Sequence, residues 1–266
     1  SFTLRRTSND VWRVISPEDL PADSALVREA IGSLSSMQIV QFVKSIVTDP
    51  DLPSYGLLPP ACEFALRTRS KSSGQTNDLL AQLSFGCKTN GNIFVRRSDE
   101  SAVYAVKIMD YINLPSHGWQ FRDRRIWDFD ESLVLKLSIR QNGELKELLH
   151  QGTNQWSFAA GSQGVINNFA VEEVAGTLGE LTAAWWTAKG ATNLAAYGIT
   201  PSSPRISVSL NQNGTAKELN LDLGGKAPSQ LQYGAVSMEG ETWIFELPAR
   251  TSELISTYLN AQTVQF

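Results

Sequence analysis

The residues best suited to chemistry lie in a charged and aromatic segment, SHGWQFRDRRIWDFDES, which spans positions 116–132. Arginine guanidinium groups bind phosphate or carboxylate in a bidentate manner, and tryptophan rings offer flat faces for stacking. The candidate interaction residues are therefore Trp119, Arg122, Arg124, Arg125 and Trp127. The acidic residues that follow could hold a cation. The alternative interpretation is a solvated linker whose charges pair locally, which is ordinary for a connector.

Other motifs that would carry chemistry are missing from the sequence. His117 and His150 are the only histidines, and no nucleophile elbow, dinucleotide motif or cluster of metal-ligand spacing accompanies them. The stretch Gly86-Cys87-Lys88-Thr89 lacks the spacing of a phosphate-binding loop. We therefore expect no catalytic residue, no cofactor and no metal. The formal net charge of −4 disfavours nucleic acid as a partner, because binding phosphates needs a basic surface.

Four tryptophans leave two interpretations open. Together with Trp119 and Trp127, the adjacent Trp185 and Trp186 could form a platform on which a sugar or a peptide stacks. Aromatic residues at such positions more often belong to the packed core, and we favour packing.

Features of the first half of the chain recur in order in the second half. Trp156 follows Trp12 by 156 − 12 = 144 positions, and the later features recur at slightly smaller spacings. The ordered series predicts an internal repeat. Its signature residues are Trp12, Tyr55, Gly56, Gly86, Trp156, Tyr197, Gly198 and Gly224.

The second half gives the clearer view of local structure. Alternating apolar residues over 133–140 predict a strand, and Asn142-Gly143 predicts a hairpin turn. A helix begins near Asn167, and Asp23 caps its counterpart. We expect an α+β fold of two tandem copies of a module, in which antiparallel strands and hairpins carry one main covering helix.

The expected domain boundaries follow from this repeat. The first copy covers residues 1–115, a linker covers 116–132, and the second copy covers 133–266. The second copy opens with the strand LVLKLSIRQN, whose counterpart in the first copy would precede Ser1. The first copy is therefore expected to lack its first strand.

The repeat also predicts the state of individual side chains. Trp12 and Trp156 should be buried where a strand meets the following helix. Placing Leu210 opposite Thr215 in the second hairpin puts Cys62 opposite Leu83 in the first. The two cysteines then lie too far apart to form a disulfide, and both thiols point toward the core.

Nearly the whole chain, and most clearly its first copy, resembles a bacterial family catalogued as domain of unknown function 4340. The resemblance rests on the pattern W-R-V-x-x-P-x-x-x-x-A-D before the helix, then on D-L-P-x-Y-G-L, F-G and V-Y-A-V. It implies an extracytoplasmic domain in the periplasm or cell envelope, anchored in a membrane by an N-terminal segment absent from this chain. Some relatives accompany transporter components of the gliding-motility type. The resemblance supplies no catalytic residues.

These observations predict a non-catalytic protein. We expect an extracytoplasmic domain of a membrane-anchored envelope protein that binds a membrane or envelope protein, as an interaction or transporter-accessory module. The alternative is a module that binds cell-wall glycan or peptide in a cleft between the two copies.

Overall fold

The computed structural model describes residues 1–8, 10–68 and 78–258, and the chain divides into two compact units. The first unit contains residues 1–17 and 22–121, and the second contains residues 18–21 and 122–266. The boundary between Phe121 and Arg122 falls inside the segment that the sequence marks as a linker.

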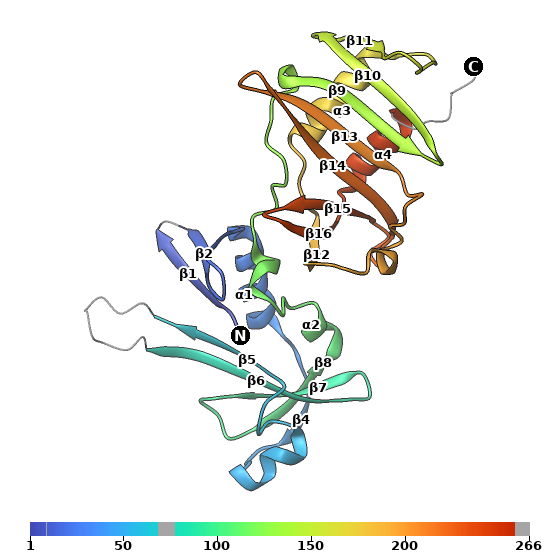
Figure 1. Ribbon diagram of the computed structural model, residues 1–266. Coiled ribbons are helices and arrows are strands. Elements are labelled where there is room, and N and C mark those ends of the chain that lie inside the picture. The colour runs from blue at the N-terminus through green and yellow to red at the C-terminus, as the bar shows by residue number, and fades with distance from the viewer. Residues whose placement is uncertain (9, 69–77, 259–266) are drawn as a thin grey trace. The chain divides into compact units, whose positions relative to one another are not determined.

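The first unit is built on a five-stranded antiparallel sheet with the strand order β4-β8-β7-β6-β5 (Figure 1). Its strands are β4 (Ile39–Lys44), β5 (Cys62–Arg67), β6 (Leu79–Thr89), β7 (Asn92–Arg97) and β8 (Val103–Lys107). Ahead of it the chain forms a three-stranded sheet of β1 (Thr3–Ser8), β2 (Val11–Ser16) and β3 (Leu20–Ala22). The helical elements are α1 (Ser24–Ser36), α2 (Ile108–Ile112), and the short 3-10 helices η1 (Asp49–Tyr55) and η2 (Gly118–Phe121).

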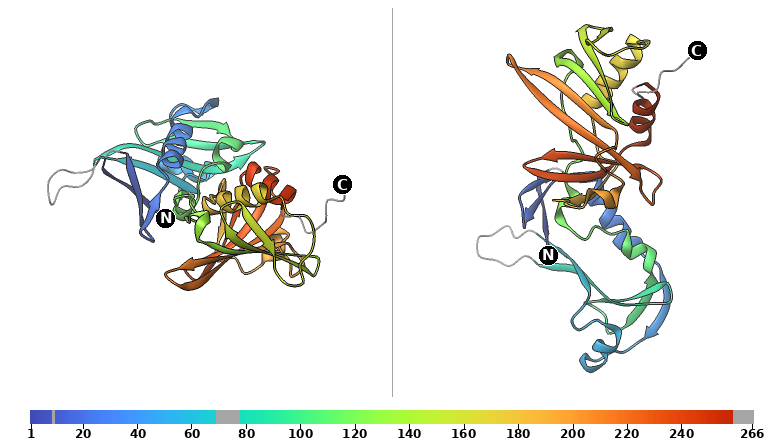
Figure 2. Two further views of the ribbon diagram at one scale, coloured as in Figure 1. Left: turned by 90° about the horizontal axis from the view of Figure 1, so that it is seen from above. Right: turned by 45° about the vertical axis from the view of Figure 1, so that its right-hand side comes forward.

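The second unit is a single eight-stranded antiparallel sheet with the order β11-β10-β9-β13-β14-β15-β16-β12. The strands are β9 (Val134–Gln141), β10 (Glu144–Gly152), β11 (Gln155–Phe158), β12 (Trp185–Lys189), β13 (Arg205–Gln212), β14 (Thr215–Lys226), β15 (Gln232–Met238) and β16 (Glu241–Glu246). The helical elements are α3 (Asn168–Gly179), α4 (Ala249–Tyr258), η3 (Glu131–Leu133) and η4 (Leu194–Tyr197). The helices α3 and α4 contact each other on one face of the sheet (Figure 2).

Both main helices begin at the caps that the sequence predicts. The Asp23 carboxylate accepts the backbone N–H groups of Ala25 and Leu26, at 2.8 and 3.2 Å, and so starts α1. The Asn167 side chain accepts the N–H of Ala170 at 3.2 Å and starts α3. More residues are buried in α3 than in α1, and the buried residues of α3 recur at helical spacing.

The expected α+β fold of two tandem modules is wrong. The protein is mostly antiparallel β-sheet in three sheets, and its helices are short. The two halves also differ, because β9 pairs with both β10 and β13 and so joins the hairpins of the second unit into one sheet. In the part of the first unit that the structure describes, no strand joins β1 to β5 in this way.

The glycines of the repeat signature lie at a contact between a turn and a strand, and this contact occurs once in each unit. Gly56 and Gly198 end η1 and η4 with φ angles of 65° and 70°, which favour glycine. A Cβ atom on Gly86 would lie 2.1 Å from the carbonyl oxygen of Tyr55, and one on Gly224 would lie 2.4 Å from that of Tyr197. The Tyr-Gly turn thus packs on a strand glycine, which explains why both features recur.

The predicted hairpin register is wrong by two residues. The Asn213-Gly214 turn joins Gln212 directly to Thr215, so Leu210 pairs with Lys217. Cys62 correspondingly pairs with Phe85 rather than with Leu83.

Both cysteine thiols are free, as predicted, but their surroundings differ from the prediction. Cys62 is partly buried, and burial raises the pKa of its thiol. Cys87 is exposed, because the pairing of β6 with β7 shifts between Phe85 and Lys88 and breaks the alternation of the strand.

Asp51 provides a pH-dependent contact at the start of η1. Its carboxylate pairs with Lys44 at 2.8 Å and accepts the backbone N–H and the hydroxyl of Thr48, both at 2.9 Å. The hydrogen bond from Lys44, followed by those from Thr48, lowers the pKa of Asp51 from 3.8 to about 2. The carboxylate therefore stabilises the fold above pH 3.8, and this contribution is lost as the pH falls through about 2.

We expect Asp51→Asn to lower the free energy of unfolding at neutral pH, because the amide cannot form the ion pair with Lys44. The difference from the wild-type chain should shrink as the pH falls from 3.8 to about 2. Urea denaturation at a series of pH values measures this difference. A difference that stays constant across that range would contradict the assignment.

Candidate functional site

The candidate interaction residues of the linker segment are mostly engaged within the protein. The backbone from Arg124 to Trp127 runs beside residues 181–183. The Ala183 N–H donates to the Arg124 carbonyl at 2.8 Å, and the Ile126 N–H donates to that of Leu181, also at 2.8 Å. Trp127 is buried, and Arg125 forms an exposed ion pair with Asp128 at 2.8 Å. Residues 124–127 are therefore packed within the second unit rather than solvated.

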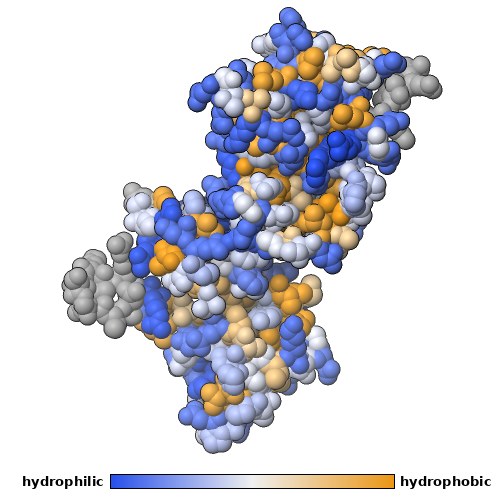
Figure 3. All heavy atoms as spheres, viewed as in Figure 1, coloured by the Kyte–Doolittle hydropathy of each residue, from blue (hydrophilic) through white to orange (hydrophobic). Residues whose placement is uncertain are grey.

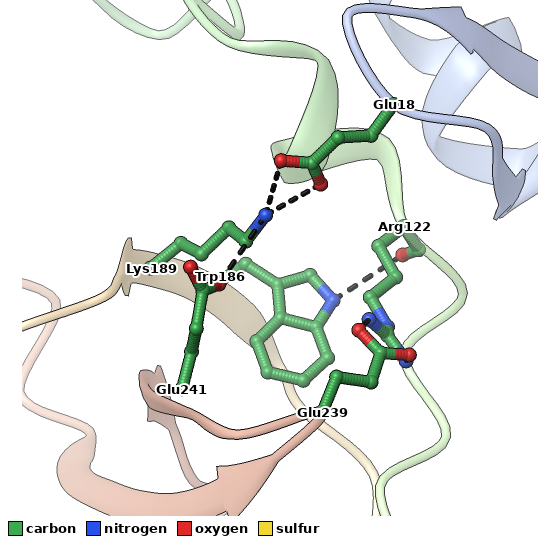
Figure 4. Close-up of polar contacts among 6 residues, drawn as sticks. All are labelled: Glu18, Arg122, Trp186, Lys189, Glu239 and Glu241. Atoms are coloured by element: carbon green, nitrogen blue, oxygen red, sulfur yellow. Dashed lines mark hydrogen bonds and ion pairs between the residues drawn. The ribbon is translucent and has the colours of Figure 1, made fainter.

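Arg122 is held by contacts of both its side chain and its backbone (Figure 4). Its guanidinium donates two hydrogen bonds to the Glu239 carboxylate, at 2.7 and 2.9 Å, and lies over the ring of Trp243, 4.9 Å from its centroid. The hydrogen bond from Arg122 lowers the pKa of Glu239. Its carbonyl oxygen accepts the Nε1–H of Trp186 at 3.2 Å. Because its guanidinium and its backbone carbonyl both form hydrogen bonds, Arg122 fixes the position of this part of the linker.

Lys189 approaches the same tryptophan, Trp243, with its Nζ 5.5 Å from the ring centroid. The ammonium group pairs with Glu18 and, at 3.3 Å, with Glu241. Burial alone would lower the pKa of Lys189, but the hydrogen bonds to Glu18 and Glu241 outweigh it and raise the pKa. Two cations and three carboxylates are thus satisfied around one indole ring, and we assign this cluster a structural role.

The four tryptophans that were considered as a stacking platform do not all belong to the same unit. Trp186 is 1% exposed and packs edge-on against Trp243, and Trp127 is also buried. Trp119 belongs to the first unit, where it stacks on His117 with ring centroids 5.5 Å apart. Packing, the interpretation favoured from the sequence, describes Trp127 and Trp186, whereas Trp119 and Trp185 are partly buried.

A second polar cluster, which the sequence reasoning missed, surrounds His150. Its ring stacks on Trp156 at 4.5 Å, its Nδ1 contacts the Val134 carbonyl at 2.9 Å, and its Nε2 lies 3.5 Å from the Glu172 carboxylate. Trp156 donates its Nε1–H to Glu172 at 2.7 Å. Both side chains of the His150–Glu172 pair are almost buried, with 6% and 12% exposed. Glu172 of α3 thus contacts both His150 of β10 and Trp156 of β11, so the cluster joins α3 to the sheet.

Within residues 1–8, 10–68 and 78–258, no group of three or more His, Cys, Asp or Glu side chains could hold a metal ion. None of the described helices has both the length and the apolar character needed to span a membrane.

Among the described residues of the first unit, an exposed apolar segment lies on the edge strand β4 and the residue pair that follows it. Ile39, Val40 and Phe42 are 49%, 50% and 66% exposed, and Ile46 is 71% exposed. We call these four residues the β4 surface. Phe42 rests edge-on against Tyr104, with ring centroids 4.9 Å apart, so its ring has a fixed support. In the view of Figure 3, apolar residues also reach the surface over α2 of this unit.

The corresponding edge of the second unit is covered. The strand β12 is also the last of its sheet, but its residues are all buried or partly buried. The contrast matters because natural proteins rarely leave an apolar edge strand open to water.

The structure is a two-unit antiparallel β protein in which the polar clusters around Trp243 and His150 make internal contacts. The chain belongs to the family described as Domain of unknown function (DUF4340), whose model matches residues 12–165. The match covers most of the first unit and extends through β9, β10 and β11 of the second. No curated protein and no solved structure matches the chain.

Proposed function

We propose that this chain is a non-catalytic module that binds a membrane or envelope protein through the β4 surface. The observation that carries the proposal is the set of four exposed apolar side chains on and beside an edge strand. An edge strand offers unpaired backbone groups as well as side chains, so it suits a protein partner better than a sugar.

The cellular setting belongs to the same proposal. We propose that the module lies outside the cytoplasm, in the periplasm or cell envelope, as part of a membrane-anchored protein that acts as an accessory to a transporter. Family membership supports this setting through the properties that the resemblance implies.

A photo-crosslinking experiment tests the docking surface. Phe42 and Phe169 are both exposed phenylalanines, 66% and 74% exposed, but Phe169 lies on α3 of the second unit and serves as the matched control. A benzoyl-phenylalanine is placed at either position, and the purified chain is irradiated with membranes of the organism that produces it.

We expect one membrane protein to be captured from position 42 and not from position 169. An excess of unlabelled wild-type chain should displace it, whereas Phe42→Glu should compete at least about tenfold less well, because a charge in an apolar contact removes a central anchor. Equal capture from both positions, or equal competition by Phe42→Glu, would contradict the proposal.

A further inference from the structure

His150 and Glu172 form a contact between the sheet and α3 that the proposed function does not use. His150 lies on β10 and Glu172 on α3, and Nε2 of the imidazole is 3.5 Å from a carboxylate oxygen. The two side chains are 6% and 12% exposed, and Nε2 itself is buried. Histidine changes its charge near neutral pH, so a nearly buried pair of this kind can make the docking of a helix depend on pH.

The surroundings of the imidazole determine which hydrogen atoms it carries. Nδ1 lies 2.9 Å from the backbone carbonyl oxygen of Val134, which can only accept a hydrogen bond, so Nδ1 carries a hydrogen. In a neutral ring the second nitrogen, Nε2, then presents a lone pair. This lone pair would face the negatively charged oxygen of Glu172, and the two acceptors would repel each other. A proton on Nε2 replaces the repulsion with an ion pair.

Trp156 favours the charged form of both partners. Its Nε1–H donates at 2.7 Å to Oε2 of Glu172, which is the same oxygen that faces His150. This hydrogen bond stabilises the carboxylate relative to the carboxylic acid, so the proton belongs on the histidine. The indole also stacks on the imidazole, with ring centroids 4.5 Å apart, and the face of an indole attracts a cation.

The charged side chains of the neighbouring strands do not compete for this contact. Successive residues of a strand point to opposite faces of the sheet. Lys136 of β9 pairs opposite Leu149, which directly precedes His150. Lys136 therefore points to the face away from His150, and it pairs there with Glu147 at 2.6 Å. The strand β11 on the other side of β10 carries no charged residue.

The charged groups of the helical elements favour a cation or are paired elsewhere. The Glu131 carboxylate of η3 lies beside Gly176, one helical turn beyond Glu172, where an added Cβ atom would be 3.8 Å from it. This second carboxylate lies on the same side of α3 and adds to the preference for a positive charge. Glu173 pairs with Arg250 of α4 at 3.4 Å.

We propose that the His150–Glu172 pair is a pH-sensitive contact, which holds α3 on the sheet while His150 is protonated. As the pH rises, the proton on Nε2 passes to the solvent and leaves a nearly buried carboxylate beside a lone pair. Detachment of α3 brings both groups into water and removes this repulsion, so the helix detaches more often.

The direction of the pH dependence follows from the protonation of the two states. An exposed histidine is half protonated at about pH 6.5. The docked helix favours the protonated ring, so the contact contributes its full stabilisation below about pH 6.5 and loses it as the pH rises further. The inference concerns the second unit and is independent of the β4 surface.

Hydrogen–deuterium exchange of the full chain tests the contact, with protection calculated relative to the intrinsic exchange rate at each pH. Protection of residues 168–179 of α3 should fall by about fivefold or more between about pH 6 and about pH 9, because release of one proton changes an equilibrium by up to tenfold per pH unit. Glu172→Gln removes the carboxylate, so protection should be lower than in the wild-type chain at about pH 6 and should then stay the same up to about pH 9. The matched control is His117→Gln, at the exposed histidine of the first unit, which should retain the pH dependence.

NMR of the unaltered chain with 15N-labelled histidine gives a second readout that needs no variant of the pair. At neutral pH both ring nitrogens of His150 should give the resonances of protonated nitrogens, and His117→Gln assigns them by removing the other set. A resonance of bare Nε2 at neutral pH would overturn the inference. Equal protection of α3 across the pH range, or a pH dependence that Glu172→Gln retains, would also overturn it.

Discussion

Trp156→Ala is expected to lower the free energy of unfolding of the second unit by about 3–5 kcal/mol, the usual range for removing a large buried aromatic side chain. Trp156 is 6% exposed and stacks on His150, and its Nε1–H donates to Glu172 at 2.7 Å. The substitution leaves a cavity under α3 and leaves the nearly buried Glu172 carboxylate without this donor. Urea denaturation followed by circular dichroism measures the loss.

Two further variants separate the causes of that loss. Trp156→Phe retains most of the ring volume and removes the hydrogen bond, so it should cost less than Trp156→Ala. Trp12→Ala should also cost less, because Trp12 is only partly buried, contrary to the expectation from the repeat. A loss below about 1 kcal/mol for Trp156→Ala would mean that this ring does not join helix to sheet.

Gly224→Ala is expected to have the second large effect. The new Cβ would lie 2.4 Å from the Tyr197 carbonyl oxygen and 2.8 Å from Cγ1 of Ile199, so the backbone of the Tyr-Gly turn would have to move. Overpacking of this kind costs about 1–3 kcal/mol, and a clash with backbone belongs at the upper end of that range. Thermal or urea denaturation of the variant measures the change.

The glycine in α1 serves as the control for this substitution. Gly32 has no heavy atom within 4 Å of an added Cβ, and it lies inside a helix, where alanine is preferred. Gly32→Ala should therefore raise stability by about 0.5–1 kcal/mol. If Gly224→Ala were tolerated as well as Gly32→Ala, the close contact between turn and strand would not exist.

Local features of the fold could be predicted from the sequence because their causes are local. Asp23 and Asn167 cap helices through side chains that reach two or three residues ahead, and Asn142-Gly143 forms its hairpin turn through its own backbone angles. The predicted hairpin register was wrong by only two residues, because the turn at Asn213-Gly214 is tighter than the prediction assumed.

The fold class could not be predicted, because it depends on which strands meet. Pairing of β9 with β13 joins Arg140 to Arg205 across more than sixty positions of the chain, and no local pattern specifies it. This pairing joins the strands of the second unit into a single sheet, whereas the strands described in the first unit form two separate sheets.

The contacts of the candidate site could not be predicted either, because they also join residues that are far apart in the sequence. The sequence showed that Arg122 carries a charge, but its partner Glu239 lies 117 positions away, in the turn between β15 and β16. The pair His150 and Glu172 was missed for the same reason, although Glu172 lies in the first turns of the helix that follows the buried Trp156. Composition identifies which groups can bind, and tertiary contacts decide which of them remain available.

The comparison of β4 with β12 explains why the proposed binding site belongs to the first unit. Both strands end a sheet, yet β12 keeps its residues at least partly covered, whereas β4 exposes Ile39, Val40 and Phe42. An exposed apolar edge promotes aggregation of a protein without a partner, and it provides a binding surface when a partner covers it.

The most direct test of the central claim is hydrogen–deuterium exchange of the chain alone and in complex with the membrane protein captured from position 42. The account predicts that exchange slows in residues 39–46 on binding, while residues 185–189 of β12 exchange at the same rate in both states. Unchanged exchange in residues 39–46, or protection of β12 in their place, would contradict the claim that the β4 surface binds the partner.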